Sequence, residues 1–158
     1  MERFHPFLER SSRLLYAASA VCLLAIVVLL MARILSRNLG LGVGGVQILA
    51  QLFEVWLTFL VVGSLAYANK HIEIEYLSDR LPERWRPIHE LAVTLVSLFA
   101  AVLILVGSLL AMSSFRNSTA PTIDIPIPLY YLAPVVGLGF LVVVYLDRIH
   151  ENVAEVLR

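Results

Sequence analysis

A short stripe of polar residues inside an apolar segment is the part of this sequence with the types and spacing to support chemistry. Gln47, Gln51, Glu54 and Thr58 follow one another at intervals of four, three and four residues within the segment 46–76. This spacing places them on one face of a helix whose other faces are aliphatic or aromatic. The pattern therefore predicts a helix in lipid or in a very apolar core, with one polar stripe directed at a partner.

Glu54 has three possible roles. It could carry protons or coordinate a cation in a transport pathway, pair within the subunit with Arg33, or hydrogen-bond across an interface to another protein. The neighbouring amides and hydroxyl favour a packed interface, because such groups hold membrane helices together. A proton relay is disfavoured because the segment offers no second buried acid or base. The residues predicted to form a subunit interface are Gln47, Gln51, Glu54, Thr58 and Arg33.

The positions of the histidines and of the cysteine argue against a cofactor. Axial ligation of a membrane haem normally needs histidines inside the bundle on two helices. The four histidines instead fall at or beyond the ends of the apolar segments: His5, His71, His89 and His150. The single cysteine, Cys22, can form neither an internal disulfide nor a metal cluster. We expect no metal, no cofactor and no enzymatic activity.

Four apolar segments must position the stripe. The 158 residues are 59% hydrophobic and 15% charged, whereas a soluble domain carries about 25% charged residues. Apolar blocks of about 20 residues are long enough to cross a bilayer as helices. The sequence predicts an all-α integral membrane protein, a single four-helix domain over residues 1–158 with spans near 14–33, 46–69, 89–115 and 126–146. Twelve basic and twelve acidic residues give no bias towards nucleic acid as a partner.

Two segments outside the spans are predicted to lie along the lipid bilayer surface. Residues 1–13 are short, charged and mildly amphipathic, which is typical of a surface segment before a first span. Between helices two and three, Leu77, Leu81, Trp85 and Ile88 repeat at helical spacing with charges between them. This predicts an interfacial amphipathic helix. The residues expected at the membrane interface are His71, Arg84, Trp85 and Arg86.

The distribution of basic residues predicts the orientation in the membrane. With four spans, the N-terminus, the connection after helix two and the C-terminal tail share one side. That side carries nine Lys and Arg residues, and the other side carries three, which are Arg33, Arg37 and Arg116. Because cytoplasmic loops carry the excess of positive charge, both termini are predicted to be cytoplasmic.

Several motifs resemble the small membrane subunit of the tripartite ATP-independent periplasmic (TRAP) transporters. The resemblance includes Val55-Trp-Leu-Thr-Phe-Leu-Val-Val-Gly63 and His71-Ile-Glu-Ile-Glu-Tyr-Leu77, followed by Leu81-Pro82. The entry to helix four, Ile125-Pro-Ile-Pro128 with Leu132-Ala-Pro134, is also similar. The similarity extends over nearly the whole chain and is sharpest at His71-Ile72.

This resemblance implies a transporter subunit in the bacterial cell inner membrane, not a complete transporter. In the family, a large multi-helix membrane subunit moves the substrate by an elevator-like motion coupled to sodium. A periplasmic solute-binding protein captures the substrate, commonly a carboxylate such as a sialic acid or a C4-dicarboxylate. The small subunit packs on the scaffold of the large one, broadens its footprint in the membrane and is expected to help dock the binding protein.

Two other classes of protein remain as alternatives. One is a self-sufficient four-helix transporter that works as a dimer with Glu54 as its coupling residue. Such proteins are shorter and usually carry the glutamate in their first helix, which has no acid in its apolar part here. The other is a membrane subunit that anchors a redox enzyme, which the absence of histidine pairs in the spans disfavours.

Overall fold

The computed structural model describes residues 4–41, 44–68 and 86–156 of the chain, and within them it contains four α-helices. In chain order these are α1 (Phe4–Asn38), α2 (Val46–Ala68), α4 (Arg86–Ser114) and α5 (Pro128–Val156). Each is long and apolar enough to cross a membrane, over Leu8–Asn38, Val46–Tyr67, Leu91–Ser114 and Pro128–Ile149. The prediction of an all-α protein with four helices long and apolar enough to span a membrane is confirmed for the described residues.

The interfacial helix that the sequence predicts between the second and third spans lies outside the described residues. The same holds for His71, Arg84 and Trp85, three of the four residues expected at the membrane interface. The fourth, Arg86, is the first residue of α4. The interfacial helix therefore stays a prediction from the sequence.

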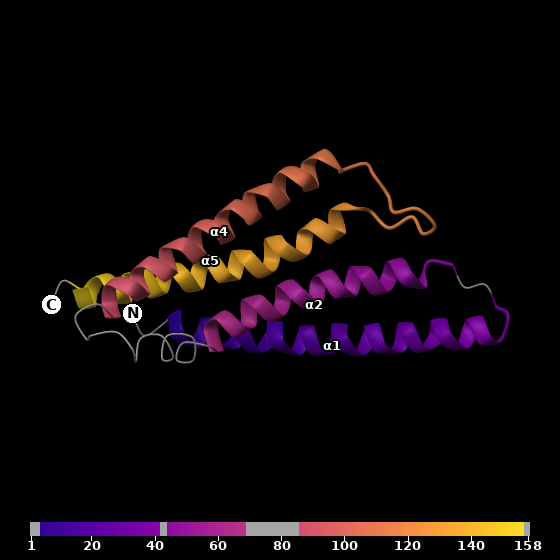
Figure 1. Cartoon of the computed structure of the whole chain (residues 1–158), viewed down its shortest axis with the longest axis horizontal. Helices are drawn as coiled ribbons and strands as arrows, with labels where there is room; N and C mark the ends of the chain where they lie inside the picture. Colours follow the sequence, from indigo (N-terminus) through magenta and orange to yellow (C-terminus); the bar gives the residue numbers. More distant parts are fainter. Residues whose placement is uncertain (1–3, 42–43, 69–85, 157–158) are drawn as a thin grey trace.

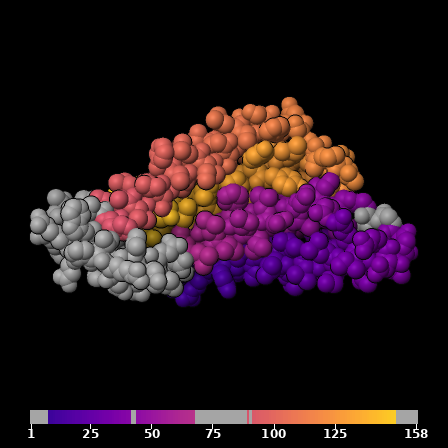
Figure 2. Space-filling view, in the orientation of Figure 1, coloured from indigo at the N-terminus to yellow at the C-terminus, as the bar shows by residue number. Residues whose placement is uncertain are grey.

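The four helices lie side by side in one layer, in the spatial order α1, α2, α5, α4 (Figure 1). Extensive contacts join α1 to α2, α2 to α5, and α5 to α4. Figure 2 shows the layer with its side chains, and all four helices reach the surface on this face. In the most apolar stretch of α1 and of α4 only 11% of the residues are buried, against 33% in α5. A layer of this kind leaves most of its apolar surface for lipid or for a partner protein.

The first helix differs from the sequence expectation. Residues 1–13 were expected to lie on the membrane surface, but α1 runs without interruption from Phe4 through the first span. Its 35 residues extend over about 52 Å at 1.5 Å per residue, far more than the ~30 Å hydrocarbon core. The N-terminal part of α1 also packs on α2, since the Ser12 hydroxyl donates a hydrogen bond to the main-chain oxygen of Ser64 at 3.2 Å. Tertiary packing thus extends α1 through residues that the sequence pattern had assigned to a separate surface segment.

The turn between α1 and α2 depends on two glycines with positive φ, Gly40 at 69° and Gly45 at 87°. The amide of Gly40 donates to Arg37 O and that of Leu41 donates to Ser36 O, which is the hydrogen-bond pair of a Schellman motif. At Gly45 an added Cβ would lie 2.5 Å from a methyl group of Ile123. The turn therefore ends α1 cleanly and brings the start of α2 against the connection between α4 and α5.

Helices α2 and α5 cross at a pair of glycines. A Cβ atom added at Gly137 would overlap the main-chain carbonyl of Phe59, and one added at Gly63 would lie 3.0 Å from the carbonyl oxygen of Gly137. Small residues at such a crossing let two membrane helices approach closely. Beside it, Ala101 of α4 packs with Leu138 and Leu141 of α5 in the buried core. The crossing fixes the two central helices, which carry the candidate site.

Candidate functional site

The polar stripe of α2 (Gln47, Gln51, Glu54 and Thr58) lies on the surface of the layer. All four side chains are exposed, and the exposed row continues along the helix through Val62 and Leu65. These six are the exposed positions among the described side chains of α2, and they follow one another at intervals of four, three, four, four and three. Because these intervals follow the 3.6-residue period of an α-helix, the row forms one continuous exposed stripe along the helix, against which another helix could pack.

The Glu54 carboxylate accepts no hydrogen bond and forms no ion pair with any described residue. It lies eight residues after the first residue of α2, about 12 Å along the helix axis at 1.5 Å per residue. The Thr58 hydroxyl does not serve it, because that hydroxyl donates to the main-chain oxygen of Glu54 at 2.9 Å. A carboxylate in this position needs donors from outside the described part of the chain.

Arg33 does not form the intramolecular pair with Glu54 that the sequence left open. No ion pair between them lies within 4.0 Å, and both residues are described and exposed. The Ser12–Ser64 hydrogen bond fixes the antiparallel register of α1 and α2, so Glu54 lies level with about Cys22. Arg33 is eleven residues further along α1, about 16 Å along the axis, which is too far for its side chain to reach Glu54.

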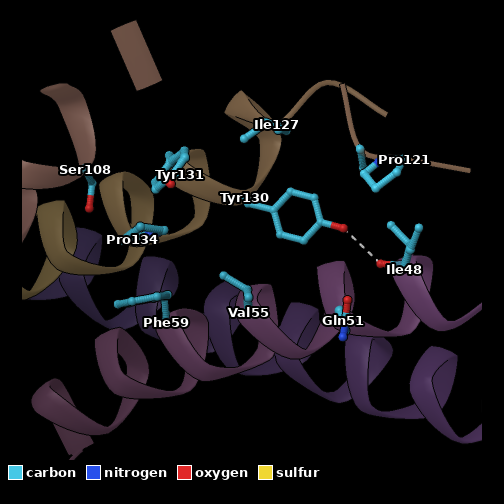
Figure 3. A pocket seen from close by; sticks show the side chains of 11 residues that line it. Ile48, Gln51, Val55, Phe59, Ser108, Pro121, Ile127, Tyr130, Tyr131 and Pro134 are labelled. Carbon is cyan, nitrogen blue, oxygen red and sulfur yellow. Dashed lines mark hydrogen bonds between the residues drawn. The ribbon is translucent and has the colours of Figure 1, made fainter. Parts of the chain in front are cut away.

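A groove with a volume of about 560 Å³ includes Gln51 of the stripe in its lining (Figure 3). Ile48, Gln51, Val55 and Phe59 of α2 form one side, and residues of α5, of α4 and of the connection between them form the rest. The full lining is Ile48, Gln51, Val55, Phe59, Ser108, Ala120, Pro121, Ile127, Tyr130, Tyr131 and Pro134. The lining is predominantly apolar, with a few polar groups at its edge, as is usual for binding sites.

Hydrogen bonds and ring contacts hold the walls of the groove in place. The Tyr130 hydroxyl donates to the main-chain oxygen of Ile48 at 3.0 Å and so ties α5 to α2 at one end of the groove (Figure 3). The indole of Trp56 donates to the main-chain oxygen of Leu129 at 3.2 Å. The ring of Tyr131 stacks on that of Phe115, with centroids 5.9 Å apart. The groove is therefore formed before any partner binds.

The connection between α4 and α5 is ordered by its own backbone. Ala120 N donates to Ile125 O at 2.8 Å, and Ile127 N donates to Ser118 O at 2.9 Å. These bonds surround a bridge between Thr119 and Pro126, so the segment doubles back on itself. Its prolines were visible in the sequence, but nothing in the sequence indicated that the segment contributes to a groove with α2.

At the opposite end of the layer, Arg148 of α5 fastens the end of α2. Its guanidinium donates to the main-chain oxygen of Ala66 at 2.5 Å and lies 5.9 Å from the centroid of the Tyr145 ring. Ala66 is in the last turn of α2, where carbonyls lack partners within the helix and a positive charge is favourable. This contact joins the two helices at the end of the layer where α1 begins and α5 ends (Figure 1).

Residues that could hold a metal do not gather in the described part of the chain. It contains no group of three or more His, Cys, Asp or Glu side chains with the arrangement of a metal site. Cys22 is a free, buried cysteine. The features that remain for function are the polar stripe and the groove.

Residues 26–155 match the family model described as tripartite ATP-independent periplasmic transporters, DctQ component. The chain belongs to the DctQ family. The matched range begins inside α1 and includes the whole of α2, α4 and the groove, so both surface features of this DctQ chain lie within the family region. A search of curated proteins finds no match.

Membership confirms the resemblance seen in the sequence and makes the chain the small component of a TRAP transporter. The family is a transporter component, and it implies association with a large membrane subunit and a binding protein. The polar stripe was predicted correctly as one exposed row on one helix. Its role at an interface stays a prediction, and the groove residues beyond Gln51 were not foreseen.

Proposed function

We propose that this DctQ chain is a scaffold that packs, through the polar stripe of α2, on the large elevator subunit of a TRAP transporter. The assembled transporter lies in the bacterial cell inner membrane. It takes up a carboxylate-type solute by a secondary, sodium-coupled mechanism after a periplasmic solute-binding protein has captured that solute. The small subunit stabilises the assembly and provides no solute pathway of its own.

The exposed stripe of α2 is the observation that carries this proposal. Polar groups facing lipid lose the hydrogen bonds that water or protein would provide, and each such loss is unfavourable. Gln47, Gln51 and Glu54 face outward from one of the two central helices of the layer. A second protein that covers α2 would satisfy these groups, whereas a single layer of helices has no enclosed centre for a charged solute.

We further propose that both termini are cytoplasmic and that an interfacial helix lies on the cytoplasmic surface. The support is the nine-to-three distribution of basic residues. Both ends of the described chain lie at one end of the layer, as four spans require (Figure 1). His71, Arg84, Trp85 and Arg86 are proposed to lie at the head groups on this side.

Reconstitution into proteoliposomes tests the scaffold function. The chain alone should give no uptake of a C4-dicarboxylate or a sialic acid under a sodium gradient. Uptake should appear when the large membrane subunit and the binding protein of the same transporter are added. Transport by the chain alone would refute the proposal and favour a self-sufficient four-helix transporter with Glu54 as its coupling residue.

A further inference from the structure

The polar stripe and the groove form one continuous surface on α2, which we call the α2 face. Gln51 belongs to both, since it is exposed in the stripe and also lines the groove. Val55 lies four residues after Gln51, one turn along the same side of α2, so the groove and the stripe adjoin at Gln51. A partner that fills the groove therefore also contacts Gln51, one residue of the stripe.

We propose that the α2 face seats one transmembrane helix of the large subunit, which inserts bulky apolar side chains into the groove and places a basic side chain against Glu54. This inference rests on the proposed function and specifies the partner chemistry that the interface requires. It assigns the occupant of the groove and the charge of the group that pairs with Glu54.

The polar groups on the face select protein over lipid as the occupant. An acyl chain could fill an apolar groove, but it offers no hydrogen bond to the amide of Gln51 or to the carboxylate of Glu54. Leaving such a group without a hydrogen bond in an apolar medium costs on the order of several kcal/mol, as transfer from water to apolar solvents indicates. A helix can fill the groove and donate hydrogen bonds in the same contact, which an acyl chain cannot do.

The carboxylate of Glu54 favours a basic side chain as the group that it pairs with. A carboxylate accepts hydrogen bonds through two oxygens, and within the described residues no donor reaches it. Neutral donors would leave a full negative charge about 12 Å along the axis of α2 from its first residue, where an unpaired charge is unfavourable. An arginine or a lysine both donates hydrogen bonds and cancels the charge, and arginine can do so with two parallel bonds.

The shape of the α2 face favours a helix as its occupant. The exposed row of α2 recurs every three or four residues from Gln47 to Leu65 and so forms a straight stripe along the helix, which a second helix can follow over its whole length. The groove, at about 560 Å³, lies within the ~300–1,000 Å³ range of sites that hold a drug-sized molecule. Two large side chains from successive turns of one helix have comparable bulk. The Tyr130–Ile48 hydrogen bond keeps the groove formed, so little ordering is needed when the helix docks.

Photo-crosslinking in the complete transporter tests the occupant. A p-benzoylphenylalanine residue is placed at Val55 in the groove or at Thr58 in the stripe, with the exposed Val28 of α1 as the matched apolar reference. We expect Val55 and Thr58 to form products with one helix of the large subunit, at yields several-fold above Val28. If the large subunit co-purifies but both sites react only with lipid, the inference is overturned and the proposed function stands.

A charge exchange tests the partner group. Glu54→Arg should lower the amount of co-purifying large subunit on the order of tenfold or more, because two positive charges would meet in the interface. Exchanging the basic residue identified by crosslinking for Glu should restore the complex. The matched charge reversal Glu9→Arg, at an exposed pair with Arg13, should change little.

The two proposals fail in different ways. If crosslinking identifies a helix without a basic residue opposite Glu54, or if the exchange gives no restoration, the inference is wrong although the subunit assembles. If no large subunit co-purifies with the unaltered chain, the proposed function itself is wrong.

Discussion

Gly137 lies where α5 crosses α2, and replacing it with alanine should separate the two central helices. The added Cβ would lie 2.6 Å from the carbonyl carbon and 2.9 Å from the Cβ of Phe59. Carbon atoms in ordinary contact lie about 3.5–4.0 Å apart, so the helices would have to move apart by about 1 Å. The neighbour is main chain, which cannot rotate away as a flexible side chain would. Overpacking of this kind costs about 1–3 kcal/mol.

Gly139 provides a matched control two residues further along α5. A Cβ added there meets nothing within 4 Å, so Gly139→Ala makes the same chemical change without the overlap. Replacing a glycine inside a helix with alanine usually stabilises by about 0.5–1 kcal/mol. Both variants gain this term, so we expect them to differ in free energy of unfolding by the overpacking cost alone, about 1–3 kcal/mol, with Gly137→Ala the less stable.

Thermal unfolding of the detergent-solubilised protein can measure this difference. Val144 of α5 is 1% exposed, so a cysteine there, in a Cys22→Ala background, should react with a fluorogenic thiol reagent only after α5 opens. For a protein of this size about 1 kcal/mol corresponds to about 2–4 °C in Tm, which gives an expected difference of about 2–12 °C. Equal midpoints for the two glycine variants would show that the crossing is not a close-packed contact and would refute the reasoning.

Two further predictions concern assembly and orientation. Glu54→Gln should lower the yield of assembled complex, and Glu54→Leu should lower it further, while uptake per assembled complex stays unchanged. A variant that assembles normally but loses uptake would instead assign Glu54 to ion coupling. Single cysteines at Asn117 and Ser78, in a cysteine-free background, should react with an impermeant reagent added outside only at Asn117, and the reverse pattern would invert the orientation.

The four spans and the polar stripe could be predicted because each depends on local sequence alone. Uninterrupted apolar length determines whether a helix can cross a bilayer, and the spacing of Gln47, Gln51, Glu54 and Thr58 determines a shared face whatever packs around it. The continuation of α1 towards Phe4 could not be predicted in this way, because it depends on contacts such as that between Ser12 and Ser64 of another helix.

The groove and the glycine crossing are tertiary properties that the sequence does not expose. Gly137 is one of several glycines in apolar segments, and only the structure shows that it meets Phe59 whereas Gly139 meets nothing. Likewise, Tyr130 lines the groove because α5 lies between α2 and α4 in the layer. An order of helices that differs from chain order cannot be read from hydropathy, and neither can the separation between Arg33 and Glu54.

The spatial order α1, α2, α5, α4 has a consequence for how the protein is made. Of the three extensive contacts between described helices, two join sequence neighbours, α1 with α2 and α4 with α5. Such contacts need little loop closure and can form as soon as the second helix of each hairpin leaves the ribosome. The contact between α2 and α5 must wait for the last helix. During biosynthesis the two hairpins would then form first in the bilayer. Their later association would depend on the close approach of α2 and α5 at Gly63 and Gly137.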